Sequence, residues 1–127
     1  MLGIINEKVL TITEEYTAKT MGSGILDVFA TPAMVALMEG TAAESVEKSL
    51  EEGSTTVGIM IHTEHLAATP IGMKVRCISR VTAVEGRKLS FEIEVFDEVG
   101  LIGKATHERF IVNAEKFQQK VNEKISK

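Results

Sequence analysis

The segment 31–50, TPAMVALMEGTAAESVEKSL, constrains the fold more than any other part of the chain. Its apolar residues recur with the 3.6-residue period of a helix, and its first half is apolar nearly all round. Such a half-helix must be enclosed by other elements, whereas the amphipathic second half can face water. Thr31 is expected at the N-cap with Pro32 at the first helical position, and Gly53 is expected to end the helix.

Strand-like segments surround this helix. Residues 6–16 form one, and four more follow at 54–66, 73–84, 89–97 and 101–112, rich in Val, Ile and Thr. Residues 17–30 are expected to be a loop, and residues 113–125 a short amphipathic helix. Short connections between the last four strands predict hairpins and an antiparallel sheet. We therefore expect one α+β domain over residues 1–127, with the sheet wrapped around a long central helix.

Composition excludes several classes of protein. The chain has 127 residues, enough for one domain with its own core, and a net charge of −4, which argues against a nucleic-acid binder. Its single cysteine, Cys77, forbids an intrachain disulfide, is expected in the core, and suits a cytoplasmic location. The first residues lack the apolar core of a signal peptide, and no apolar run approaches the length of a membrane span.

Glu39 ends the apolar run that starts at Ala33, and two interpretations are open. It is either a surface glutamate at the edge of the apolar stripe, which the pattern alone favours, or a pocket carboxylate available as a base. Thr31 lies eight residues earlier, which places it about 80° away around the helix and roughly two turns along it. The two side chains can border one pocket but cannot touch directly.

Three further positions carry candidate chemistry. His62 and His65 are three apart and face opposite sides of a strand, so they make no metal pair. His65 lies at the strand end and is either an acid–base residue or a solvated loop histidine. Arg109 shares a face with His107 and either holds a phosphate or carboxylate or pairs with a glutamate on a neighbouring strand. Gly58, inside a strand, predicts a bulge or the close approach of another group.

Four stretches together, VFATPAMVALMEG, VGIMIHTEHLAATPIGMKV, VEGRKLSF and IGKATHERFIV, resemble the fluoroacetyl-CoA thioesterase-like branch of the hotdog-fold acyl-CoA thioesterases. With EKFQQKV they cover most of the chain from Val28 onward. The resemblance implies the hotdog fold and a catalytic trio at Thr31, Glu39 and His65. It also implies that Gly58 and Arg109 contact the substrate.

The same resemblance implies an activity and an assembly. The activity is hydrolysis of a short acyl-CoA thioester to a carboxylic acid and free CoA, without a metal or a redox cofactor. The assembly is a homodimer with its pocket between the subunits, and whether dimers pair into tetramers is left open. A non-catalytic acyl-CoA-binding module, a sensor or a carrier-binding domain, is the alternative. Residues 18–28 lack the phenylalanine-rich lid of the fluoroacetate-resistance enzyme, so specificity for fluoroacetyl-CoA is not implied.

Overall fold

The computed structural model describes residues 1–126. Its centre is a five-stranded antiparallel sheet with the strand order β1-β3-β4-β5-β2. The strands are β1 (Ile5–Thr11), β2 (Ser54–His65), β3 (Lys74–Glu85), β4 (Lys88–Phe96) and β5 (Leu101–Asn113). The helices are α1 (Ala18–Met21), α2 (Thr31–Glu47) and α3 (Ala114–Asn122), with two 3₁₀ turns, Glu14–Tyr16 and Glu123–Ser126.

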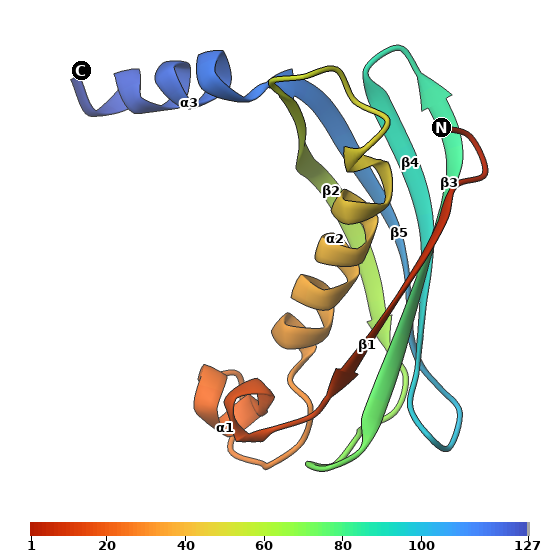
Figure 1. Cartoon of the computed structure of the whole chain (residues 1–127). Helices are drawn as coiled ribbons and strands as arrows, with labels where there is room; N and C mark the ends of the chain where they lie inside the picture. Colours follow the sequence, from red (N-terminus) through yellow and green to blue (C-terminus); the bar gives the residue numbers. More distant parts are fainter. Residues whose placement is uncertain (127) are drawn as a thin grey trace.

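The sheet curves around α2, which lies along its inner face (Figure 1). The helix buries the face that it turns toward the sheet, but Val35 is only half-buried and Ala36 is exposed, so the apolar first half is not enclosed on all sides as expected. The strands contribute every second side chain, as a sheet with one covered face should. The predicted α+β architecture is therefore confirmed. The helix contributes Ala33, Met34, Leu37, Met38, Ala42 and Val46 to this core, and β4 contributes Leu89, Phe91, Ile93 and Val95.

The ends of α2 differ from the prediction. Ala30, not Thr31, is the N-cap residue and makes no side-chain capping bond, while Thr31 is already helical. The helix ends at Glu47 rather than near Gly53, which adopts a positive φ of 84° in the turn before β2. Beyond Glu47 only the half-buried Leu50 could anchor another helical turn, and short helices without such packing are not stable.

The sequence predicted a hairpin between the strands at 54–66 and 73–84, and this prediction is wrong. β2 pairs with β5 at one edge of the sheet, and residues 66–73 carry the chain to β3, near the opposite edge. The backbone amides of Leu66 and Ala67 both bond to the carbonyl of Ile102, which keeps the chain beside β5 at the point where β2 ends. β2 is consequently an edge strand with one side unpaired.

The N-terminal segments also differ in detail. β1 ends at Thr11, and part of the expected loop forms the single turn of α1. The register of β2 against β5 shifts between Gly58 and Met60, which confirms an irregularity at Gly58. Cys77 is buried, as expected.

The C-terminal helix α3 extends away from the sheet beyond β2 (Figure 1). It is amphipathic, as predicted, and its apolar side chains Phe117 and Val121 are exposed. None of the helices in residues 1–126 combines the length and the apolar character needed to cross a bilayer.

Candidate functional site

Thr31 and His65 meet where the start of α2 passes the end of β2. The Thr31 hydroxyl lies 2.7 Å from His65 Nδ1, a hydrogen bond between residues 34 positions apart in the sequence. The edge of the Phe29 ring faces the imidazole, with ring centroids 6.4 Å apart. Because Ala30 is the N-cap residue, the hydroxyl of Thr31 is free of a capping role and available to His65.

An open hollow of about 350 Å³ borders this pair. Its walls come from the start of α2, the end of β2 and the segment around α1, and they are mostly apolar. Ser23 and Val28, from the segment between α1 and α2, contribute to these walls. The residues lining the hollow are Ala18, Ser23, Val28, Phe29, Ala30, Thr31, His65, Leu66, Ala67 and Ala68.

His65 is held mainly in its neutral form. Burial lowers its pKa below the ordinary value of 6.5, and a backbone interaction with Ala67 offsets this only in part. Its Nε2 is buried and makes no hydrogen bond to any part of the chain that the structure describes. A neutral imidazole bonded to a hydroxyl is the arrangement in which histidine can take a proton from a nucleophile.

Glu39 belongs to a second group of side chains, farther along α2. A Cβ atom added at Gly58 would lie 2.9 Å from Glu39 Oε2, 3.3 Å from Arg109 Nη1 and 3.4 Å from His107 Cε1. These three side chains therefore surround the α-carbon of Gly58, and the missing Cβ makes room for them. Glu39 is half-buried rather than fully exposed, so the simple surface interpretation does not describe it.

Arg109 is 8% exposed and is fixed by neighbours on two strands. Its Nε donates to the Thr56 hydroxyl at 2.7 Å and its Nη2 donates to the Thr56 carbonyl at 2.9 Å. Its Nη1 lies 3.3 Å from His107 Nε2. Burial lowers the pKa of the guanidinium, and the nearby Glu39 carboxylate opposes this shift. The negative charge of Glu39 therefore helps Arg109 to remain charged inside the protein.

The predicted site residues thus fall into two groups within one chain. Thr31 and His65 are bonded to each other, and Glu39, Gly58 and Arg109 gather around the β2 bulge. Glu39 lies eight positions after Thr31 in the helix, a distance of about 12 Å along the axis. No hydrogen bond joins the two groups within residues 1–126.

Sequence reasoning missed two members of the second group, Thr56 and His107. The shared face of His107 and Arg109 was visible in the sequence, but the side-chain bond between them was not. Thr56 reads as an ordinary strand threonine, and no signal in the sequence distinguishes it. Both roles depend on the pairing of β2 with β5, which the sequence did not reveal.

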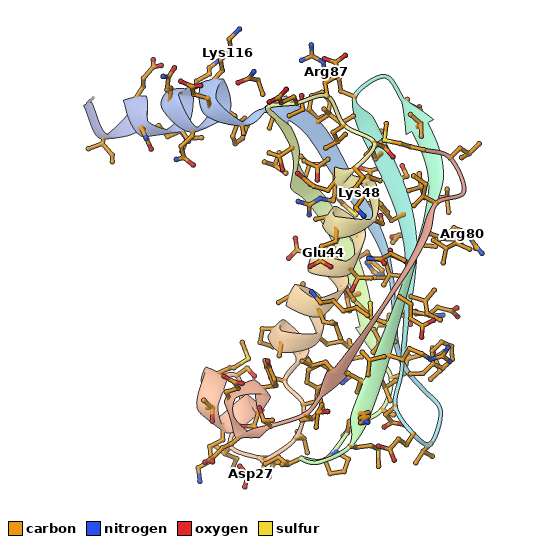
Figure 2. The ribbon with its side chains drawn as sticks, viewed as in Figure 1. Asp27, Glu44, Lys48, Arg80, Arg87 and Lys116 are labelled. Atoms are coloured by element: carbon orange, nitrogen blue, oxygen red, sulfur yellow. The ribbon has the colours of Figure 1, made fainter. Side chains whose placement is uncertain are left out.

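A larger hollow of about 420 Å³ lies on the outer face of the sheet, away from α2. Its walls carry exposed charges from four strands, including Arg80, Glu92 and Lys104. Arg80 points away from the helix side of the sheet (Figure 2), and it bonds to Glu92 at 2.9 Å. These groups are solvated and largely paired with one another, so this hollow is a weaker candidate than the one beside His65.

Within residues 1–126 no three His, Cys, Asp or Glu side chains are arranged to hold a metal ion.

Replacing Gly58 with Ala tests the close approach at the bulge. The added Cβ would contact Glu39 Oε2 at 2.9 Å, so we expect the carboxylate to move and the free energy of unfolding to fall by about 1–3 kcal/mol, as in other overpacked sites. Urea denaturation and a crystal structure of the variant measure the two effects. Gly100→Ala is the matched control, because a Cβ there meets nothing within 4 Å. An unmoved carboxylate with unchanged stability would contradict the packing described.

Comparison with known proteins places this chain in a family. The sequence model of the fluoroacetyl-CoA-specific thioesterases matches residues 12–115. The chain is 42% identical over 98 residues to the fluoroacetyl-CoA thioesterase of Streptantibioticus cattleyicolor, covering 77% of this chain and 70% of that protein. A solved structure of the fluoroacetyl-CoA thioesterase FlK superposes with a TM-score of 0.93 at 33% identity, over 98% of this chain and 96% of that one. A Thermus thermophilus protein of the thioesterase superfamily matches with a TM-score of 0.89 at 28% identity, over 99% and 96%. The predicted hotdog fold is confirmed, and the chain belongs to the fluoroacetyl-CoA-specific thioesterase family of hotdog proteins.

Proposed function

We propose that this protein hydrolyses a short acyl-CoA thioester to a carboxylic acid and free CoA. The observation that carries the proposal is the 2.7 Å bond between Thr31 Oγ1 and His65 Nδ1 at the edge of an open, mostly apolar hollow. Family membership supports it, since the relatives are named as thioesterases and a FlK structure with 32% identity was solved with acetyl-CoA. The segment 18–28 has Met21, Ile25 and Leu26 in place of a phenylalanine-rich lid, so the proposal does not extend to fluoroacetyl-CoA.

Two chemical routes fit these residues. In the first, His65 takes the proton of Thr31 as the hydroxyl oxygen attacks the thioester carbonyl, with Glu39 orienting or activating these groups. The C–S bond breaks, CoA leaves as the thiol with that proton, and water then hydrolyses the acyl-threonine. In the second, the Glu39 carboxylate either attacks the thioester carbonyl to give an anhydride that water then hydrolyses, or takes a proton from a water molecule that attacks the carbonyl. Thr31 positions the attacking group, the C–S bond breaks, and His65 transfers the proton with which CoA leaves as the thiol. The 2.7 Å bond meets the geometric requirement of the first route. The positive end of the α2 dipole, close to Thr31, favours the oxyanion that develops in either route.

The pocket is proposed to lie between two copies of the chain. The free edge of β2 exposes Ile59 and Met60, and a second copy can pair with it antiparallel about a twofold axis. Antiparallel pairing sets the end of one β2, with His65, against the first half of the other, near Gly58. The partner subunit's Glu39 would then approach Thr31 and His65, which the Glu39 of the same chain does not reach. Helix α3, whose apolar side chains Phe117 and Val121 are exposed, extends past the same edge (Figure 1).

Other expectations stay predictions. A tetramer, a cytoplasmic location, a single domain over residues 1–127, and the contact of Gly58 and Arg109 with substrate are untested. The phosphate role of Arg109 is less direct than the sequence suggested, because its guanidinium is buried and oriented by Thr56 and His107.

The alternative function, acyl-CoA binding without turnover, does not require a hydroxyl bonded to a neutral histidine, so the Thr31–His65 pair favours hydrolysis over it.

Thiol release from a panel of acyl-CoA esters tests the activity. We expect turnover of short acyl groups by the wild type and a loss of at least about 100-fold in kcat for Glu39→Gln, since that variant cannot act as a base. Glu44→Gln, on the exposed part of the same helix, is the control and should keep full activity. Binding of CoA esters without any thiol release would support the sensor alternative.

The pH dependence tests the role of His65. The imidazole must be neutral to take a proton, so activity should fall as the pH drops through its pKa. Because that pKa is lowered from 6.5, kcat/KM should stay level down to below pH 6.5 and decline only at more acidic pH. Titration of His65 by NMR assigns the decline to this residue. A decline that begins above pH 6.5 would contradict the proposed environment.

Mixing two inactive variants tests whether Glu39 acts across the dimer. Refolding Thr31→Ala together with Glu39→Gln should restore about a quarter of wild-type activity, because about half of randomly paired dimers are hybrids and each holds one intact site. Thr31→Ala mixed with His65→Gln is the control and should stay inactive, since those two residues meet within one chain. No recovery in the first mixture would show that Glu39 does not complete the partner's site.

A further inference from the structure

His107 is a buried histidine that the proposed mechanism does not use. It lies on β5 opposite Ile61 of β2 and is 1% exposed. Its ring packs on Phe91, with centroids 5.8 Å apart. An imidazole buried so completely must have its polar atoms satisfied inside the fold, and its partners indicate what it does.

The partners fix which nitrogen carries the proton. Nδ1 lies 2.7 Å from the Met60 carbonyl, which can only accept a hydrogen bond, so Nδ1 must donate. Nε2 lies 3.3 Å from Arg109 Nη1, which can only donate, so Nε2 must accept. His107 is therefore a neutral imidazole with its proton on Nδ1. A charged ring would have no lone pair for Arg109 and would oppose it with a second positive charge.

The bonds from His107 to Met60 and to Arg109 both lead to the residues around Glu39. Met60 closes the β2 bulge, where the register against β5 shifts, so the bond from Nδ1 holds the bulge in place. The bond at Nε2 orients the same Arg109 nitrogen that lies beside Gly58, and His107 Cε1 itself packs against the space above Gly58. His107 thus links the β2 bulge, through Met60, to the Arg109 guanidinium, and both lie close to the Glu39 carboxylate.

The electrostatic surroundings agree with a neutral ring. Burial is the largest influence and lowers the pKa of His107 below 6.5, and the positive charge of Arg109 lowers it further. The bond to Met60 and the carboxylates of Glu39 and Glu108 raise it, without cancelling the effect of burial.

We propose that His107 is a positioning residue that fixes the β2 bulge and the charge of the Arg109 guanidinium beside Glu39, so that this carboxylate keeps its place for thioester hydrolysis. The inference rests on the proposed function of the site. It assigns His107 no contact with substrate: its effect passes through Arg109 and Gly58. Loss of the bond to Arg109 should therefore lower kcat more than it changes KM, because it displaces a reacting group rather than a binding surface.

Two substitutions separate the two bonds. The amide nitrogen of His107→Asn can reach the Met60 carbonyl in the place of Nδ1, but the side chain is too short to meet Arg109. The amide oxygen of His107→Gln can reach Arg109 in the place of Nε2. We expect a loss of up to about 100-fold in kcat for the Asn variant, as for other small displacements of reacting groups. The Gln variant should recover most of that loss. His62→Asn and His62→Gln, at an exposed histidine of β2, are matched controls and should keep full activity.

A double-mutant cycle tests the route through Arg109. Arg109→Lys should lower kcat in the wild-type background and add little in the His107→Asn background, because both changes break the same contact. Losses that multiply, equal losses in the Asn and Gln variants, or an effect on KM alone would overturn the inference. So would an effect only on the melting temperature, which a purely structural histidine would produce.

Nitrogen NMR of the histidine rings tests the proposal without turnover. We expect His107 to be neutral at pH 7 with its proton on Nδ1, and a charged ring or a proton on Nε2 would overturn the inference. The outcomes also separate the two proposals. Absence of thiol release by the wild type would defeat the proposed function, whereas turnover by the wild type with full kcat in His107→Asn would defeat only the inference about His107.

Discussion

The burial of the apolar face of α2 against the curved sheet is the constraint on which the rest of the structure depends. The side chains of Met34 and Met38 are completely buried, and the sheet approaches closely enough that a Cβ at Gly103 would lie 2.6 Å from the sulfur of Met34. Burial of large apolar side chains is the main favourable contribution to folding, so the helix cannot shift along the sheet without a large loss. That fixed position decides which strand residues stand beside Thr31 and Glu39.

The two polar groups of the site exist because α2 and β2 run past each other in opposite directions. The start of the helix meets the end of the strand, and Thr31 bonds to His65 there. Two turns farther along the helix, Glu39 meets the middle of the strand at Gly58. One packing arrangement therefore creates a neutral hydroxyl–imidazole pair at one point and a charged group at another. A dimer formed through the free edge of β2 would bring the Thr31–His65 pair of one subunit next to the charged group of the other.

The charged group is costly to bury, and its surroundings reduce that cost. A guanidinium removed from water needs partners for its N–H groups and a compensating negative charge. Thr56 and His107 supply the hydrogen-bond acceptors, and Glu39 supplies the charge. Glycine at position 58 provides the space. The carboxylate at the end of the apolar helical run therefore lies near a buried cation, whose charge it helps to compensate.

The sequence by itself determined the elements and the candidate residues. The apolar period of residues 31–50 predicted an enclosed helix, alternation in residues 89–97 predicted a strand with one buried face, and the motifs around Thr31, Glu39 and His65 indicated the family. Only the tertiary structure decided that β2 pairs with β5 rather than with β3, that Thr31 bonds to His65, and that Arg109 bonds to Thr56. The physical reason is that period and motif report which face of an element is buried. Strand order and side-chain hydrogen bonds depend instead on contacts between residues far apart in the chain, about which local sequence says nothing.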